Sequence, residues 1–186
     1  MNGIQRMARY IKNGGTRSNS EKEDRLSRGL KVGENSYIFS WEGIDANWPW
    51  LISIGSGVTV SSGVQILAHD ASPNKAGCHT KLGRVIIGDY VFVGARSVIL
   101  CNVRIGDHVI IGAGSVVSRD CEPGYVYAGN PARKICSIEE YHNKHEKMQN
   151  KRPDLSKIRK WDDWGNASEE EKQQMIDLLS DGCGYI

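Results

Sequence analysis

The feature that most constrains this chain is a six-residue period of aliphatic residues in its central part. Between residues 87 and 117 every sixth position is isoleucine or valine, and glycine follows most of them. The same spacing occurs upstream of an interruption, with a weaker copy near residue 32. The repeated positions are Ile87, Val93, Ile99, Ile105, Ile111 and Val117, then Ile54, Val60 and Ile66, and finally Val32 and Ile38.

Neither an alternating β-strand nor an α-helix explains a period of six. An alternating strand places apolar residues at every second position, and a helix at every third or fourth. A short strand followed by a corner does give six, with the aliphatic residue inward and glycine easing the turn. Three such sides close a triangular coil of about eighteen residues, and coils stack at roughly 4.8 Å. The period therefore predicts a mainly β protein, a parallel β-helix over residues 31–135. Chance periodicity in a β-sandwich is the alternative, which six consecutive matches disfavour.

Three segments lie outside the regular repeat. The polar, aperiodic stretch between Asp70 and Val85 predicts an exposed loop at about 71–84, and long loops on rigid scaffolds are often functional. Residues 1–30 are expected to form an N-terminal entry segment, of which residues 10–30 are mobile or loosely docked. Residues 136–186 are expected to form a helical extension. Capping-box patterns at residues 137–140 and 168–171 predict the starts of two α-helices there.

Composition excludes several functional classes. A formal net charge of +2 without a basic stripe argues against nucleic acid as a partner. The N-terminus has no apolar run long enough for a signal peptide, and no segment has the length and apolarity of a membrane span. The five cysteines form no CxxC pair. These features predict a reduced, cytoplasmic protein.

His69 is the most suggestive single residue. It lies three positions after the inward Ile66, hence on the outside of the coil, and directly before the loop. Imidazole can exchange a proton near neutral pH, which suits a general base. The competing interpretation is a histidine that ends a strand and bonds to a loop carbonyl.

The order of motifs resembles that of the hexapeptide-repeat O-acetyltransferases. The matching stretches are the hexads, ILAHDAS with its polar loop, RVIIGDYVFVGARSVIL, IGDHVIIGAGSVVSRD and AGNPARKI. The resemblance covers roughly residues 30–145 and is strongest to the branch that acetylates sugars for bacterial surface polysaccharides, with relatives among galactoside and antibiotic acetyltransferases. It implies a left-handed β-helix, a homotrimer, and acetyl-CoA bound in the groove between neighbouring subunits.

The resemblance also implies roles for individual residues. His69 would take the proton from a sugar hydroxyl as that hydroxyl attacks the thioester, without an acyl-enzyme. His79 would line the acceptor pocket, and Asp70 would orient His69 or the acceptor. Aromatic rings beside carboxylates suit sugar binding, so Trp41 and Asp45 are further acceptor candidates, although a tryptophan in an early coil also suits the core or the trimer interface.

Eight residues match the family's cofactor positions. Small residues at two successive corners would let the pantetheine arm lie against the backbone, and basic residues would contact the nucleotide phosphates. The residues are Gly94, Ala95, Gly112, Ala113, Ser118, Arg119, Arg133 and Lys134. The competing interpretations are corner geometry for the glycines and alanines, and a solvated basic turn for Arg133 and Lys134.

Other functions of a β-helix stay open. A zinc carbonic anhydrase needs three converging histidines, and the spacing of His69, His79 and His108 does not favour one, so we expect no metal. A non-catalytic scaffold predicts no CoA binding. The residues also do not distinguish acetyl from formyl or longer acyl donors.

Overall fold

The structure is a computed structural model, and it describes residues 16–186 of the chain. The described part divides into two compact units. The first unit runs to Ile138 and contains the repeats, and the second covers Glu139–Ile186.

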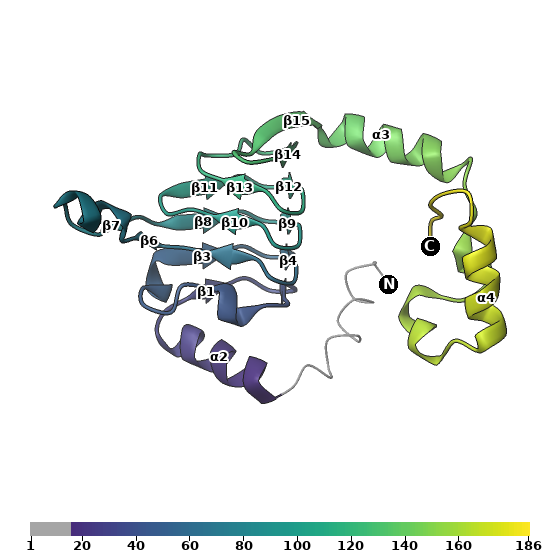
Figure 1. Cartoon of the computed structure of the whole chain (residues 1–186), viewed down its shortest axis with the longest axis horizontal. Helices are drawn as coiled ribbons and strands as arrows, with labels where there is room; N and C mark the ends of the chain where they lie inside the picture. The colour runs from purple at the N-terminus through teal and green to yellow at the C-terminus, as the bar shows by residue number, and fades with distance from the viewer. Residues whose placement is uncertain (1–15) are drawn as a thin grey trace. The chain divides into compact units, whose positions relative to one another are not determined.

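The repeats form a coil with three faces, and each face is a sheet built from successive turns of the chain (Figure 1). The first face contains β1 (Lys31–Val32), β3 (Ile52–Ile54), β8 (Val85–Ile87) and β11 (Val103–Ile105). The second contains β2 (Tyr37–Ile38), β4 (Thr59–Val60), β9 (Phe92–Val93), β12 (Ile110–Ile111) and β14 (Tyr125–Ala128). The third contains β5 (Gln65–Ile66), β10 (Val98–Ile99) and β13 (Val116–Val117). All of these neighbours pair in parallel, so the predicted stack of parallel strands is confirmed.

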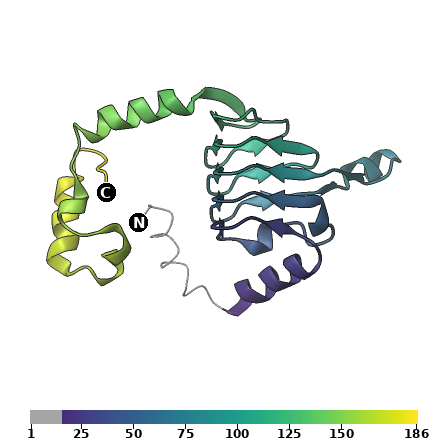
Figure 2. The same cartoon turned by 180° about the vertical axis from the view of Figure 1, so that it is seen from behind.

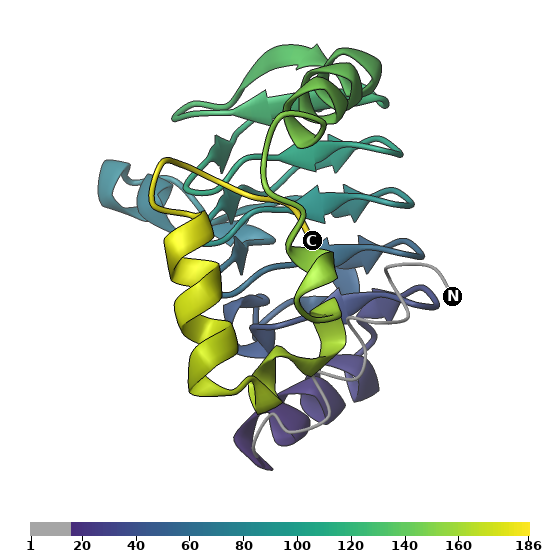
Figure 3. The same cartoon turned by 90° about the vertical axis from the view of Figure 1, so that its right-hand side faces the viewer.

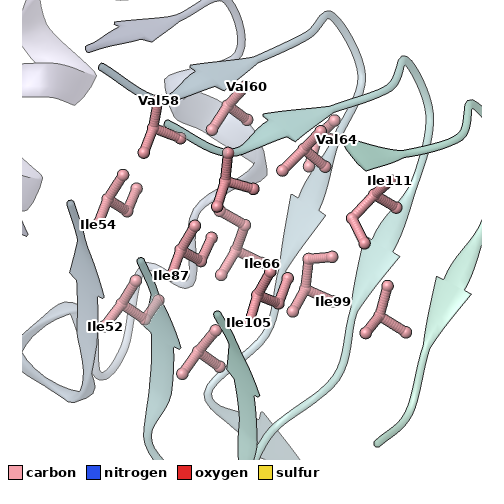
Figure 4. Packing of buried hydrophobic residues seen from close by; sticks show 14 of the residues in the cluster. Ile52, Ile54, Val58, Val60, Val64, Ile66, Ile87, Ile99, Ile105 and Ile111 are labelled. Atoms are coloured by element: carbon pink, nitrogen blue, oxygen red, sulfur yellow. The ribbon is translucent and has the colours of Figure 1, made fainter. Parts of the chain in front are cut away.

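The aliphatic ladder fills the interior of the coil (Figure 4). Ile66, Ile99 and Ile111 have no exposed surface, whereas the strand residues that alternate with them face outward. Burying each such side chain stabilises the fold by about 1.5–3 kcal/mol. The period of six therefore reflects the repeated sides of the coil. Each side turns its aliphatic residue inward together with the residue two positions before it, as Val103 and Ile105 do in β11.

Carboxylates tie successive turns together at one corner. The Oδ1 atom of Asp107 accepts a hydrogen bond from the backbone N–H of Asp89 at 2.8 Å, eighteen residues earlier. Asp89 in turn accepts one from the N–H of Ser56 at 2.7 Å. These bonds satisfy amides that the short strands leave unpaired at the corners.

The predicted loop leaves the coil as a small hairpin, visible from both sides in Figures 1 and 2. Strands β6 (His69–Asp70) and β7 (Lys81–Leu82) pair antiparallel at its base. A 3-10 helix, η4 (Ser72–Ala76), lies between them, and most of the hairpin is exposed. The sequence predicted the exposure but not the pairing.

Each end of the coil is covered by an element that does not follow the six-residue repeat. Helix α2 (Thr16–Ser27) lies against the N-terminal end, followed by the buried Leu30. The sequence predicts loose docking for this segment, yet Arg25 of the helix is only 9% exposed; residues 1–15 of the same segment lie outside the described residues. At the other end, β15 (Arg133–Ser137) returns antiparallel to β14 and ends the parallel stack.

The second unit contains α3 (Ile138–Gln149), the 3-10 helices η5 (Leu155–Lys157) and η6 (Trp161–Asn166), and α4 (Glu169–Leu178), seen from the side in Figure 3. The predicted capping box begins α4, because Ser168 Oγ accepts from Glu171 N–H and the Glu171 carboxylate accepts from Ser168 N–H. In residues 16–186 no helix has the length and apolarity needed to cross a bilayer.

Candidate active site

The predicted base lies where the coil gives way to the hairpin, next to a buried carboxylate. The Nδ1 atom of His69 is 2.5 Å from Oδ2 of Asp45, which comes from the preceding turn of the coil. Asp45 follows the 3-10 helix η2 (Trp41–Gly43) and has no exposed side-chain surface. The His69 side chain is 29% exposed. The pair therefore joins an interior carboxylate to an imidazole at the surface.

Backbone amides hold the Asp45 carboxylate in place. Oδ1 accepts hydrogen bonds from the N–H groups of Asn47 at 2.9 Å and Trp48 at 3.3 Å, and Oδ2 accepts from Ala68 N–H at 2.9 Å. Burial raises the pKa of Asp45, but the hydrogen bonds from His69 and these amides together lower it below its ordinary value of 3.8. Asp45 is therefore ionised at neutral pH.

An ionised partner determines which nitrogen of His69 carries the proton. A carboxylate can only accept hydrogen bonds, so Nδ1 must donate, and Nε2 of the neutral ring then holds a free lone pair. The ring of Trp48 packs on the imidazole with centroids 4.6 Å apart. Within residues 16–186 Nε2 has no hydrogen-bond partner, so it can accept a proton from a ligand.

The lowered pKa of Asp45 predicts a pH-dependent stability difference between the wild type and Asp45→Asn. Because the folded-state pKa lies below 3.8, the ionised carboxylate stabilises the fold above that pH. This contribution is lost as the pH falls through the folded-state value. We expect Asp45→Asn to unfold with about 1–3 kcal/mol less free energy at pH 7, and the difference to shrink below pH 3.8.

Urea unfolding at a series of pH values measures this difference. Asp70→Asn is the matched control, because the Asp70 carboxylate is exposed and its pKa is lowered by Ser72. Its substitution should change stability less at every pH. A pH-independent gap between the wild type and Asp45→Asn would contradict the prediction.

The other predicted acceptor residues are scattered. Asp70 accepts from Ser72 N–H at 2.9 Å within the hairpin, and His79 is exposed further along it. Trp41 is only 8% exposed, with Nζ of Lys22 of α2 lying 5.7 Å from its ring centroid. Trp41 and Asp45 are thus largely buried, while Asp70 and His79 lie in the exposed hairpin that begins at His69.

The four small residues predicted for the cofactor lie at one corner in consecutive turns. Gly114 N–H donates to the carbonyl of Ala95 at 2.9 Å, which joins the two turns. A Cβ atom on Gly94 would lie 2.4 Å from the nitrogen of Ala113, so glycine is needed there for stacking alone. At Gly112 a Cβ would lie 3.0 Å from Cβ of Ala128. Ala95 and Ala113 are exposed, and in the described part of the chain their amides have no partner.

The predicted residues Ser118 and Arg119 line a surface pocket of about 530 Å³. Arg84 and Arg104, which the sequence analysis did not single out, line the same pocket. The remaining lining residues are Ile86, Asn102, Val103 and Asp120. Among residues 16–186 none of the three guanidinium groups has an ion-pair or hydrogen-bond partner. Three unpaired arginines around one pocket favour a polyanionic ligand.

The last two predicted cofactor residues lie in β15 rather than on a turn. The Nζ atom of Lys134 is 2.6 Å from the Glu122 carboxylate and 3.8 Å from the centroid of the Tyr125 ring. Its pKa is raised by the hydrogen bond to Glu122. Arg133 is exposed, and among the described residues its guanidinium group donates to the neighbouring Ala132 carbonyl alone, at 3.3 Å. Lys134 is therefore already paired, whereas most of the Arg133 guanidinium is available.

Comparison with known proteins identifies the family. The family described as bacterial transferase hexapeptide (six repeats) matches residues 84–119. Protein CapG of Staphylococcus aureus is 42% identical over 132 residues, an alignment that covers 66% of this chain and 74% of CapG. The chain belongs to the hexapeptide-repeat transferase family. The predicted resemblance is thereby confirmed.

Further relatives show what kind of enzyme this hexapeptide transferase is. The putative acetyltransferase YvoF of Bacillus subtilis (strain 168) is 33% identical over 118 residues, 63% of this chain and 66% of YvoF. A maltose O-acetyltransferase from Clostridium difficile 630 superimposes with a TM-score of 0.51 and 26% identity, covering 72% of this chain and 83% of that one. The hexapeptide transferase is an acyltransferase.

No metal ligand set is present in the described part of the transferase. In residues 16–186 no group of three or more His, Cys, Asp or Glu side chains is arranged to hold a metal ion. His69 instead contacts Asp45 and Trp48. These residues therefore offer no zinc site of the kind that a carbonic anhydrase needs.

Sequence reasoning missed the partner of His69 in this transferase, because it places Asp45 with the acceptor. The stretch Asp45-Ala46-Asn47 does carry a local signal, since an aspartate often accepts from the amide two residues on. That signal predicts a turn, but it gives no indication that a histidine 24 residues away contacts the same carboxylate. The structure places the Asp45 carboxylate against His69, a contact that the sequence analysis did not predict.

Proposed function

We propose that this hexapeptide transferase moves an acetyl group from acetyl-CoA to a hydroxyl of a sugar or polysaccharide precursor. The observation that carries the proposal is the His69–Asp45 pair, with Nε2 free at the surface. The names of YvoF and of the maltose O-acetyltransferase support an acetyl donor, and the second supports a sugar acceptor.

In this reaction His69 acts as the general base. Nε2 takes the proton of the acceptor hydroxyl while the oxygen attacks the thioester carbonyl of acetyl-CoA. Asp45 stabilises the imidazolium that forms and keeps Nδ1 protonated. The tetrahedral intermediate then collapses, the carbon–sulfur bond breaks, and the proton on Nε2 passes to the leaving thiolate. The products are the acetyl ester and CoA.

The residues along the coil fit the chemical groups of CoA. CoA carries several phosphate charges, and Arg84, Arg104 and Arg119 present unpaired guanidinium groups around one pocket in the described chain. The exposed amides of Ala95 and Ala113 are donors that suit the carbonyls of a pantetheine arm. We assign the phosphates to the pocket and the arm to the corner.

Two finer features belong to this proposal. The coil is left-handed, as family membership implies. Three copies of the chain assemble, and each acetyl-CoA molecule binds in a groove between neighbouring subunits. Sedimentation equilibrium of the full chain should give the trimer mass.

A thiol-release assay tests the function. The protein is mixed with acetyl-CoA and a panel of sugars, nucleotide sugars and hydroxylated antibiotics, and free CoA is measured with a thiol reagent. We expect release that depends on one class of sugar acceptor, and mass spectrometry should find the acetyl ester. Absence of CoA binding by calorimetry, together with no release on any acceptor, would favour the scaffold alternative.

The arginine pocket makes a separate kinetic prediction. Replacing Arg84 or Arg104 by glutamine is expected to raise the KM for acetyl-CoA about tenfold each, because each change removes a charge-assisted contact. The turnover number should stay within about twofold of wild type, since neither residue contacts the reacting atoms. Steady-state kinetics with varied acetyl-CoA at saturating acceptor measures both quantities.

Lys31→Gln is the matched control for the arginine variants. Lys31 is an exposed cation at the other end of the same sheet, in β1, and does not line the pocket. It should leave both constants unchanged. An increase in the KM for the acceptor instead of acetyl-CoA would show that the pocket binds the acceptor.

A further inference from the structure

Helix α2 reaches the turn that carries Asp45 through a buried arginine. The side chain of Arg25 is 11% exposed, and its Nε–H donates to the carbonyl of Ile44 at 3.0 Å. Ile44 directly precedes Asp45 and is itself 2% exposed. A guanidinium group is costly to bury unless it is hydrogen-bonded, so this contact is a specific one.

A second arginine holds the other side of the same turn. Arg28, which directly follows α2, donates from Nη2 to the carbonyl of Asn47 at 3.2 Å. The two guanidinium groups are linked through Asp24, which contacts Arg25 and lies 3.7 Å from Arg28. The helix and the residue after it thus bind one carbonyl before Asp45 and one after it.

Both the coil and α2 hold this turn. Asp45 N–H donates to the carbonyl of Ile66, and Ile44 pairs with Ile66 as an isolated bridge. Residues 46–48 lie outside the strands. The amides of Asn47 and Trp48 donate to the Asp45 carboxylate, and Arg28 donates to the Asn47 carbonyl. The Trp48 ring packs on His69 and against the core, and the Trp48 carbonyl accepts from Leu51 N–H. The position of the carboxylate therefore depends on α2 as well as on the coil.

We propose that Arg25, assisted by Arg28, is a positioning residue for the His69–Asp45 pair. The inference rests on the proposed function, and it adds the N-terminal helix to the machinery of the site. Arg25 acts through the Ile44 carbonyl, which sets where the Asp45 carboxylate meets Nδ1 of His69. Displacements of about 1 Å at such a pair lower turnover markedly while leaving substrate binding intact.

Kinetics of Arg25→Met test the proposal. Methionine keeps an apolar stem but cannot donate to the Ile44 carbonyl. We expect the turnover number to fall about ten- to a hundredfold, with both KM values within about twofold of wild type. Arg25→Lys, which retains one donor, should recover part of the loss. Arg28→Met should have a smaller effect, because the Arg28 side chain is 41% exposed.

Nuclear magnetic resonance of the His69 ring gives a readout that does not depend on turnover. In ¹⁵N-histidine-labelled protein we expect the wild type to show a downfield Nδ1–H proton shared with Asp45, and Arg25→Met to shift or broaden it. Lys22→Met is the matched control, because it removes a cation from the same helix that lies over Trp41 and not at the turn. It should leave the His69 signals and the turnover number unchanged.

The kinetic and the magnetic resonance measurements together separate the failure of this inference from the failure of the proposed function. Unchanged turnover and unchanged His69 signals in Arg25→Met would overturn the positioning role. If wild-type protein turns over no acceptor, the His69 signals still decide whether Arg25 positions the pair. If circular dichroism shows that Arg25→Met does not fold, the test passes to Arg25→Lys and Arg28→Met. Wild-type turnover and wild-type His69 signals in both of these variants would reject the inference.

Discussion

His69→Gln is expected to lower the turnover number for acetyl transfer by about three orders of magnitude, while the affinity for acetyl-CoA stays near that of wild type. Glutamine has a similar polar end but cannot take a proton at neutral pH, and positioned general bases typically contribute about 10²–10⁴-fold. Asp45 would also lose its contact with the imidazole, while its carboxylate keeps the hydrogen bonds from backbone amides. The thiol-release assay gives the rate, and calorimetry with CoA gives the affinity.

His79→Gln is the control for this experiment. His79 is exposed in the same hairpin, and it contributes to the acceptor pocket at most through contact, so its substitution should affect the KM for the acceptor rather than the chemical step. Together the two variants separate the loss of a base from a general disturbance of the hairpin. Undiminished turnover in His69→Gln would remove His69 from the mechanism.

Asp45→Asn is expected to lower the turnover number by about two to three orders of magnitude. The amide presents either an oxygen or an NH₂ group to Nδ1, and the amides of Asn47 and Ala68 compete for the oxygen. His69 can then adopt the tautomer with its proton on Nε2, which cannot act as a base. An uncharged partner also no longer stabilises the imidazolium.

Asp70→Asn is the matched variant, because it makes the same chemical change on the residue that directly follows His69. The Asp70 carboxylate accepts a hydrogen bond from Ser72 N–H rather than from the imidazole. Its turnover should stay within about threefold of wild type. Long-range ¹⁵N correlations of the His69 ring report the tautomer directly. Wild-type turnover in Asp45→Asn, with Nδ1 still protonated, would show that another group orients His69.

Local sequence was sufficient for the repeating part of the fold. Inward positions such as Ile99 are buried because each side of the coil takes six residues and points the same positions of every hexad inward. The capping box at Ser168 predicted the start of α4 for the same reason, since its two hydrogen bonds join residues three apart. Where the contacts that determine a structure join residues close in sequence, or recur at a fixed spacing, the sequence pattern is enough to predict that structure.

The site depended on contacts that have no such period. Asp45 meets His69 across 24 residues, and Arg84, Arg104 and Arg119 share a pocket although none lies eighteen residues from another. Insertions such as the 71–84 hairpin and the turn after η2 interrupt the repeat, so sequence spacing no longer gives position along the coil. Arg25 is a stronger case, because a charged residue in a polar helix gave no sign of burial.

The sequence by itself therefore determined the coil, its aliphatic interior and the place of His69 at its edge, because these follow from a repeated local geometry. Only the tertiary structure decided that Asp45 contacts His69, and that α2 holds the turn that carries Asp45. Stacking brings distant turns within hydrogen-bond distance, and which side chains meet there depends on how each irregular segment docks.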